Sequence, residues 1–551
     1  MLRRKKYFSI LLVTLLTFTT VAFSACSQSP AIKTNATKQA NTNDANAGPL
    51  TPYKDTITIS VMRENNPDIW FPKEESIKDN FLTKFYKEKL NISFNSKWLV
   101  DRGRMAEQLD LAIASNDLPD AFEANSAQIY KLARAGQIQP IKDVYDKYAS
   151  TKVKEILGAQ NNLFFQPATV DGKVYGIPQT SDFADGIQEL YIRQDWLDRL
   201  GLQPPKTMDD LTKVSKAFVE NDPDGNGIKD TFGISMDNSL SNPVDGIGDG
   251  LGVYPDMWLP DSSGKLVYTG VTSGMKNVLQ FMQDLYKMGV FDPEFAVKDF
   301  NKVTETIAAN KVGIIYGAFW APLVQPQASK KNDPKAVWKC YPIPMNTSGG
   351  KIKAWSSNYR WLVIKADFKN PEAVVKQNNL WYELWQGQYS TFYHGKNQTD
   401  YKQAQENLKY YVPFWFDPPM KNYEQDIELR EALKTNDPSK ITRAEAKKMW
   451  TLISNPTDLY GWSQNLIVTQ SEKVLVDDYK NNYIYSAFQG PTTPLIASKQ
   501  PLTDKLKNEQ YTKFIMGQSL NGWDDFVSNW YKVGGQDLTD EVNKWYQTQT
   551  K

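Results

Sequence analysis

From Thr56 onward the apolar and polar positions become periodic. The stretch "TITISVM" (56–62) alternates β-branched and polar residues and predicts a strand, and "ISFNSKWL" (92–99) predicts a second. A helical pattern separates them over "ESIKDNFLTKFYKEKLN" (75–91), and another follows over "RMAEQLDLAIASN" (104–116). Strands that alternate with helices at this spacing indicate an α/β fold with a largely parallel sheet.

The same alternation continues along the chain. A strand is predicted over "GKVYGIPQT" (172–180), and a later one over "YRWLVIKA" (359–366) precedes a helix over "PEAVVKQNNLWYELW" (371–385). Two helices are predicted over 194–201 and 207–221, and the C-terminal third is mostly helical in pattern. Because 551 residues exceed the size of a single core, we expect two or more lobes.

The first residues have a different pattern. Four basic residues, Arg3 to Lys6, precede an apolar run from Tyr7 to Ala25, which is typical of a secretory signal. The run ends in "FSAC", which resembles the lipobox of bacterial lipoproteins, although Phe23 stands where an aliphatic residue is usual. The resemblance implies that Cys26 is acylated, with palmitate as an expected acyl chain, after cleavage of residues 1–25. A plain secretory signal or an uncleaved anchor helix are the alternatives.

Residues 26–55 are rich in Asn, Thr and Ala and poor in large apolar residues, so we expect a flexible tether. No later stretch of the sequence is long and apolar enough to span a bilayer. We therefore expect a lipid-anchored protein on the extracellular face of the cell membrane.

The amino-acid composition limits the classes of partner that this protein can bind. Lys+Arg 64 and Asp+Glu 63 leave almost no net charge, which disfavours a nucleic-acid partner. The 16 Trp, 28 Tyr and 25 Phe residues can fill a core, and they also supply flat, half-wet surfaces of the kind that bind ligands.

A concentration of oxygen donors occurs in "DPDGNGIKD" (222–230). Counted from Asp222, side-chain oxygens occupy positions one, three, five and nine, a glycine occupies position six, and the residue at seven offers its backbone carbonyl, as in an EF-hand loop. The predicted Ca²⁺ ligands are Asp222, Asp224, Asn226, Ile228 and Asp230. Position twelve is Gly233 and not the usual Glu, so water, Thr231 or a distant acid must complete the shell. The alternative is a turn without an ion.

Seven motifs, in order, resemble one family. They are "ASNDLPDAF" (114–122), "DGKVYGIP" (171–178), "LYIRQDWLDRLGLQPPKTMDDL" (190–211), "DPDGNGIKDTFGI" (222–234), "LYKMGVFDPEFA" (285–296), "NKVGIIYGAFWAP" (310–322) and residues 514–546. Together they are similar to the extracellular solute-binding lipoproteins of carbohydrate ABC transporters, above all the large oligosaccharide type of Gram-positive bacteria.

The resemblance implies a two-lobed, periplasmic-binding-protein-like (type II) α/β fold with a hinge between the lobes. Lobe one would comprise 56–178 and 338–390, and lobe two 179–337 and 391–551, with crossings near "YGIPQ" and "KCYPIP". It also implies a monomer that captures an oligosaccharide in the cleft and delivers it to ABC transporter permease subunits.

Sugars present apolar C–H faces edged by hydroxyls, so they are held by aromatic platforms with polar partners. By resemblance, Trp320 in "YGAFWAP" is the expected platform, with Tyr316 nearby, while Glu123 and Asn125 approach from the other lobe. Trp355 is a further candidate. Each of these residues has a structural alternative, the rings as core and Glu123 as a solvated acid.

Two other functions remain open at this point. A surface-anchored glycoside hydrolase would use paired carboxylates, which counting cannot exclude, although the single His394 makes zinc and Ser–His chemistry improbable. A receptor for a peptide or an amino-sugar polymer is the other alternative. We expect a binding protein and not an enzyme.

Overall fold

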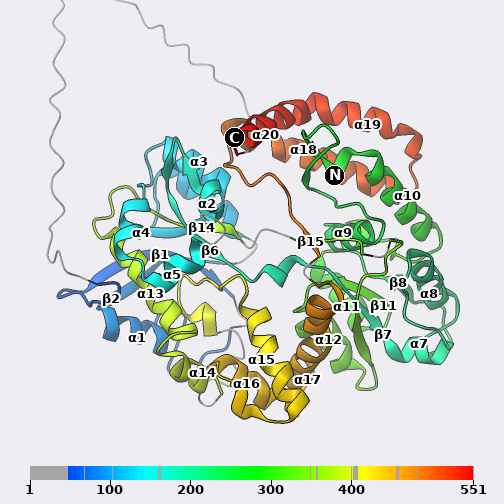
Figure 1. The fold of residues 1–551 in the computed structure, drawn as a ribbon, viewed down its shortest axis with the longest axis horizontal. Coiled ribbons are helices and arrows are strands. Elements are labelled where there is room, and N and C mark those ends of the chain that lie inside the picture. The colour runs from blue at the N-terminus through cyan, green and yellow to red at the C-terminus, as the bar shows by residue number, and fades with distance from the viewer. Residues whose placement is uncertain are drawn as a thin grey trace, which may run out of the picture. The chain divides into compact units, whose positions relative to one another are not determined.

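Two β-sheets, each assembled from segments distant in the sequence, organise the fold (Figure 1). The structure is a computed structural model, and Asn46–Lys551 forms one compact unit in it. The residues it describes are 48–66, 69–101, 104–158, 163–347, 349–354, 358–398, 400, 408–454, 458–480 and 482–549.

The first sheet has five strands in the order β2-β1-β3-β14-β6. Both β2 and β3 run parallel to β1, whereas β14 is antiparallel to β3 and β6, so the predicted parallel sheet is mixed. The strands are β1 (Ile57–Asn65), β2 (Ile92–Asp101), β3 (Ala121–Ala124), β6 (Gly176–Thr180) and β14 (Asn358–Ile364).

Both faces of this sheet are covered. Along β14, Leu362 belongs to one buried cluster and Val363 to another, as the two-residue period of a strand requires. Some of the covering helices start at side-chain caps; Asn80, for example, forms a capping box at the start of α1. The covering helices are α1 (Phe81–Leu90), α2 (Met105–Ser115), α3 (Ser126–Arg134), α4 (Lys142–Tyr148), α5 (Thr151–Leu157) and α13 (Pro371–Trp385).

The second sheet has four strands in the order β12-β7-β11-β8. Its strand β11 (Val312–Gly317) is buried along its whole length, which explains why "VGIIYG" reads as a continuous apolar run. The other strands are β7 (Glu189–Arg193), β8 (Phe232–Ile234) and β12 (Trp338–Tyr341). The helices of this part are α7 (Gln194–Leu200), α8 (Met208–Glu220), α9 (Ser241–Gly250), α10 (Ser273–Lys287), α11 (Phe300–Ala308) and α12 (Gln325–Asn332).

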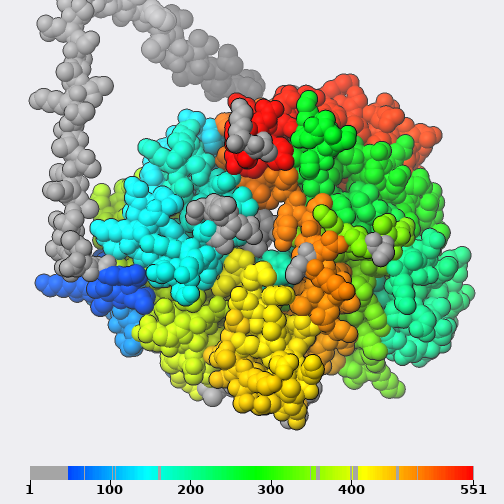
Figure 2. Space-filling model, viewed as in Figure 1, coloured from blue at the N-terminus to red at the C-terminus, as the bar shows by residue number. Residues whose placement is uncertain are grey.

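The C-terminal third is helical, as predicted. Helix α18 lies beside α10 and α20 (Figure 1), and helices α15 to α20 form a large part of the surface in Figure 2. The bounds are α14 (Ser390–Gln398), α15 (Lys421–Thr435), α16 (Ala444–Ser454), α17 (Leu459–Leu466), α18 (Pro494–Ile515), α19 (Trp523–Trp530) and α20 (Gln536–Gln549). Short strands complete the set: β4 (Thr169–Val170) with β5 (Lys173–Val174), β9 (Trp258–Pro260) with β10 (Leu266–Tyr268), and β13 (Ile352–Lys353) with β15 (Tyr483–Ile484).

None of the helices in the described part of the chain combines the length and the apolarity that a membrane crossing needs.

The chain passes from the first sheet to the second directly after β6, and returns after β12. Of the two motifs expected at the crossings, "YGIPQ" forms most of β6 and "KCYPIP" starts in β12 and continues beyond it. A further passage, which the sequence did not predict, runs beside the first: the Thr180 hydroxyl donates to the Asp417 carbonyl (2.7 Å), and the Phe183 N–H to the Pro419 carbonyl (2.9 Å).

The packing differs from the expected lobe boundaries in two segments. Residues 338–341 were expected in lobe one, but they form β12, which pairs with β7 of the second sheet. Residues 391–416 were expected in lobe two, yet Tyr393, Tyr411 and Phe416 are buried in the core of the first sheet. Aromatic side chains in this segment find their apolar contacts there, which a boundary drawn from motif order does not reveal.

Candidate ligand-binding site

A cavity of about 450 Å³ lies where β1 and β3 end. Ligands of α/β proteins bind at the carboxyl ends of parallel strands, because the loops that follow the strands converge there. We call this cavity the Trp415 pocket; the residues that give it its chemistry are Arg63, Glu64, Glu123, Asn125, Arg360 and Trp415.

Cations flank the half-buried indole of Trp415. The Arg360 guanidinium carbon and the Lys409 ammonium nitrogen each lie 4.3 Å from a ring centroid of Trp415. Arg360 also forms an ion pair with Glu123, with 3.5 Å between Nη1 and Oε2. The pocket thus combines an aromatic surface with a fixed guanidinium–carboxylate pair, whose planar groups suit vicinal hydroxyls.

The predicted Glu123 and Asn125 both line this pocket. Burial raises the pKa of Glu123, and the charge of Arg360 opposes that rise. Asn125 also caps α3: its side-chain oxygen accepts from the Gln128 N–H at 2.9 Å. The capping role fixes the position of Asn125 at the rim of the cavity.

Arg63 is 4% exposed and acts as a support for the pocket. Its guanidinium donates to the carbonyls of Ile77 and Tyr410, each at 2.5 Å, and thereby ties the segment that carries Trp415 to the end of β1. Burial lowers the pKa of Arg63 to about 9, so the side chain stays charged at neutral pH. Periodicity does not mark Arg63 or Trp415 as site residues, so the sequence alone does not identify either of them.

Trp320 and Tyr316 lie at the second sheet and have different environments. The indole of Trp320 is 36% exposed and its Nε1 donates to the carbonyl of Asp185 on the first crossing (3.2 Å). Tyr316 is 1% exposed inside β11, where Gly246 of α9 packs against its ring. A ligand cannot reach Tyr316 in this arrangement, whereas Trp320 remains accessible. Trp355 lies outside the described residues.

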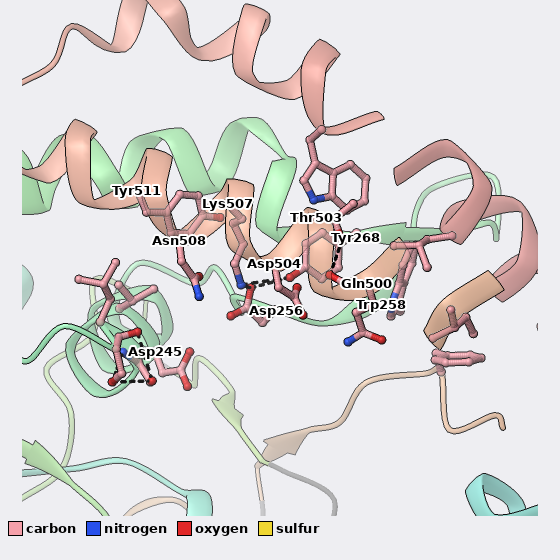
Figure 3. A pocket seen from close by; sticks show the side chains of 18 of the residues that line it. Asp245, Asp256, Trp258, Tyr268, Gln500, Thr503, Asp504, Lys507, Asn508 and Tyr511 are labelled. Atoms are coloured by element: carbon pink, nitrogen blue, oxygen red, sulfur yellow. Dashed lines mark hydrogen bonds and ion pairs between the residues drawn. The ribbon is translucent and has the colours of Figure 1, made fainter. Parts of the chain in front are cut away.

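A second cavity, of about 410 Å³, lies beside α18 and is shown in Figure 3. We call it the α18 pocket. Its walls come from the start of α9, the β9–β10 hairpin, and helices α18, α19 and α20, with Asp256, Trp258, Tyr268, Asp504 and Lys507 among its side chains. The sequence analysis did not predict this pocket. A signal for it exists in the polar residues spaced three or four apart over 500–508.

The acidic turn folds as a compact loop. Asp222 accepts from the backbone N–H groups of Asn226 (3.1 Å) and Gly227 (2.9 Å), and the Asn226 amide nitrogen lies 2.8 Å from Asp224 Oδ2 and 3.5 Å from Asp230 Oδ1. Hydrogen bonds from Gly227 lower the pKa of Asp222, and burial raises that of Asp224. Gly227 has φ +82°, which gives the sharp turn expected at position six.

Two neighbours limit how this loop can be completed. Thr231 is buried and donates its hydroxyl to the carbonyl of Phe218 (2.6 Å), and a Cβ at Gly233 would approach that of Ser215 to 2.7 Å. The Thr231 hydroxyl is therefore engaged and Gly233 has no room for a side chain, so neither position supplies a carboxylate to the loop. Among the described residues, no group of three or more His, Cys, Asp and Glu side chains is arranged to hold a metal ion.

Comparisons with known proteins agree on one family. The profile of the family described as bacterial extracellular solute-binding protein matches residues 72–378. Lipoprotein LipO of Bacillus subtilis is 25% identical over 508 residues, covering 90% of this chain and 93% of LipO. The fructooligosaccharide ABC transporter substrate-binding protein FusA of Streptococcus pneumoniae is 26% identical over 525 residues, covering 90% and 91%.

Solved structures show the same fold. The alginate-binding protein AlgQ2 has a TM-score of 0.64 at 17% identity, covering 91% of this chain and 99% of that one. FusA in complex with kestose has a TM-score of 0.60 at 20% identity, covering 90% and 99%. These structures confirm the two-lobed α/β fold, and the family match bears out the expectation of a binding protein. The chain belongs to the bacterial extracellular solute-binding protein family.

Proposed function

We propose that this protein captures an oligosaccharide outside the cell and delivers it, chemically unchanged, to the permease of an ABC transporter. The observation that carries the proposal is the Trp415 pocket, in which an indole lies beside the Arg360–Glu123 pair. Aromatic rings pack against the C–H face of a sugar, and planar charged groups hydrogen-bond its hydroxyls.

The two cations over Trp415 differ in how firmly they are held. Arg360 is paired with Glu123 at 3.5 Å, while the ion pair of the Lys409 ammonium with Asp417 is longer, at 4.0 Å. A sugar that packs on the indole displaces Lys409, because a flexible lysine returns to water at little cost. Arg360 remains and binds hydroxyls. Trp320 contributes a second aromatic surface on the carboxyl side of β11.

Relatives support a carbohydrate ligand without fixing which one. As their names state, FusA binds fructooligosaccharide, and YtcQ of Bacillus subtilis, 25% identical over 492 residues, binds polygalacturonan or rhamnogalacturonan. Fructooligosaccharide is neutral, whereas the two galacturonans are acidic. Since both relatives bind a carbohydrate chain, we assign an oligosaccharide as the ligand of this protein without specifying its charge.

We further propose that Asp222, Asp224, Asn226, Asp230 and the Ile228 carbonyl hold a structural Ca²⁺. Their donor set suits the ion, since calcium prefers carboxylate, amide and carbonyl oxygens. In the structure the Asn226 amide nitrogen, a donor, lies between the carboxylates of Asp224 and Asp230, where the ion would lie, so Asn226 would have to turn its amide oxygen inward to bind Ca²⁺. Calcium would supply charge compensation for these acids, and water would complete its shell because Gly233 cannot.

The anchor belongs to the same proposal. Cys26 lies outside the described residues, and its acylation rests on the resemblance of "FSAC" to a lipobox. A tethered receptor stays close to the permease that receives its ligand, which suits a protein of an extracellular solute-binding family.

Calorimetric titration with a panel of oligosaccharides tests the proposal. We expect saturable binding of at least one glycan, and a loss of about tenfold or more in affinity for Trp415→Ala. Trp450→Ala serves as the control, because that half-buried ring packs against the separate Leu429 cluster. No binding of any glycan, or cleavage of the one that binds, would refute the receptor function.

A further inference from the structure

The face of α18 that lines the α18 pocket carries polar side chains, although a helix face packed against the protein interior would favour apolar ones. Gln500, Asp504 and Asn508 are spaced by four residues on α18, and Thr503 and Lys507 share that face. Figure 3 shows their side chains on the side of the helix that faces the cavity. A stripe of this kind beside a space of about 410 Å³ indicates a ligand.

Most charges in this pocket are already paired. Lys353 bonds Asp245 at 2.8 Å, and both side chains are at most 5% exposed. Lys507 bonds Asp256 at 2.5 Å, a contact also drawn in Figure 3. Asp504 receives a hydrogen bond from Gln500; burial raises its pKa, and the nearby charge of Lys507 lowers it in part. Asp256 and Asp504 thus share one cation, Lys507, which leaves these three side chains with one net negative charge.

The aromatic walls of the pocket already face one cation of the protein. The Lys507 ammonium lies 5.9 Å from the ring centroid of Tyr268 and 5.8 Å from that of Tyr511, and Tyr268 stacks on Trp530 at 5.1 Å. Aromatic faces attract cations through their quadrupoles. The indole N–H of Trp530, a residue only 1% exposed that lines the pocket, has no hydrogen-bond partner among the described residues.

We propose that the α18 pocket binds a hydroxylated ligand unit that carries a protonated amine, an amino-sugar residue, with Asp504 as its counter-ion. Gln500, Thr503 and Asn508 provide hydrogen bonds for the hydroxyls, and the half-buried ring of Trp258 provides an apolar face. N-acetylation removes the positive charge, so the pocket distinguishes the free amine from its acetylated form. This inference rests on the proposed carbohydrate receptor function and specifies its ligand.

Calorimetric titration with three β-1,4-linked disaccharides tests the inference: those of glucosamine, N-acetylglucosamine and glucose. For the unaltered protein at a pH where the amine is charged, we expect the glucosamine disaccharide to bind about tenfold more tightly than the glucose one. Asp504→Asn should abolish that preference and Asp504→Glu should keep it. Glu509→Gln, on the exposed face of the same helix, should have no effect.

The outcomes separate this inference from the function on which it rests. Equal or weaker binding of the glucosamine disaccharide, or a preference that survives Asp504→Asn in a variant with unchanged melting temperature, would overturn the amine assignment. Binding of neutral oligosaccharides that depends on Trp415 would then still support the receptor. A failure of all glycans to bind would overturn both.

Discussion

The guanidinium of Arg360 lies 4.3 Å from the ring centroid of Trp415, and the same side chain pairs with Glu123 at 3.5 Å. Three segments far apart in sequence thus meet at one point: the end of β3, strand β14 and residues 408–416. Because each partner fixes another, the indole is held in position before a ligand arrives, which lowers the entropic cost of binding.

The two cations at Trp415 predict opposite effects of substitution. Arg360→Ala should weaken oligosaccharide binding by about tenfold or more, because it removes hydrogen bonds and leaves Glu123 without its partner. Lys409→Ala should leave affinity unchanged or raise it, because the sugar no longer displaces an ammonium. Calorimetry of both variants provides the measurement, and equal losses would contradict the assigned roles.

Trp320 is predicted to contribute through its ring. Trp320→Ala should weaken binding by about 1–3 kcal/mol through lost contact area. Trp320→Phe keeps an aromatic surface and loses only the hydrogen bond to the Asp185 carbonyl, so it should retain most of the affinity. If Trp320→Ala binds as the parent does, this residue lies outside the site.

Calcium removal should lower stability. A chelator is expected to reduce the melting temperature, and added Ca²⁺ to restore it, because ligands that bind only the folded state stabilise it. Asp224→Ala should abolish the response by removing one carboxylate from the loop. Asp209→Ala is the control: Asp209 lies on the neighbouring α8, outside the loop, so this variant should keep the response to chelator and Ca²⁺. A melting curve indifferent to both reagents would show that the loop holds no ion.

Buried acids beside the first crossing predict a pH dependence. Burial raises the pKa of Asp182 and of Glu189 to about 8 each, although Glu189 accepts hydrogen bonds from Tyr191 and Ser471. The folded state keeps protons that the unfolded chain releases near pH 4, so the free energy of unfolding that these groups contribute falls as pH rises from about 4 to about 8.

Thermal melts across that range check this sign. Glu189→Gln cannot ionise and should flatten the decline in melting temperature toward pH 8 relative to the parent. The exchange Glu107→Gln, at an exposed position of α2, should leave the slope as it is. If the melting temperature of the Glu189→Gln variant falls with pH as steeply as that of the parent, Glu189 does not cause the pH dependence of stability.

Anchoring is tested by Cys26→Ala. Loss of the acylated cysteine should release the protein into the medium, and Cys340→Ala, which alters a buried cysteine in β12, should leave it on the membrane. Immunoblots of membrane and medium fractions report the distribution. Retention of the Cys26 variant would instead favour an uncleaved anchor helix.

Most secondary structure was predictable because it follows local periodicity. The helix expected over 371–385 is α13 with the same bounds, and the strand expected over 56–62 is β1, which continues to Asn65. The order of motifs along the chain does not predict which of the two sheets a segment joins, because strand pairing depends on tertiary contacts. Strand β12, for example, pairs with β7 of the second sheet.

The site could be predicted only in part. Glu123 and Asn125 follow directly on a strand, so the sequence places them at its carboxyl end. Tyr316 lies within β11, which is covered on both faces, so its ring belongs to the core. Trp320 lies beyond the end of this strand and is accessible. Trp415 lies in an aromatic stretch, "YYVPFWF", that has no period, and only tertiary contacts distinguish it from its neighbours.

The central claim is that the protein binds an oligosaccharide and releases it intact. Equilibrium dialysis against labelled oligosaccharides, followed by chromatography of the recovered sugar, tests it most directly. We predict retention of at least one glycan in the protein compartment, with every recovered molecule at its original length. Equal label on both sides for every glycan, or the appearance of shorter products, would contradict the account.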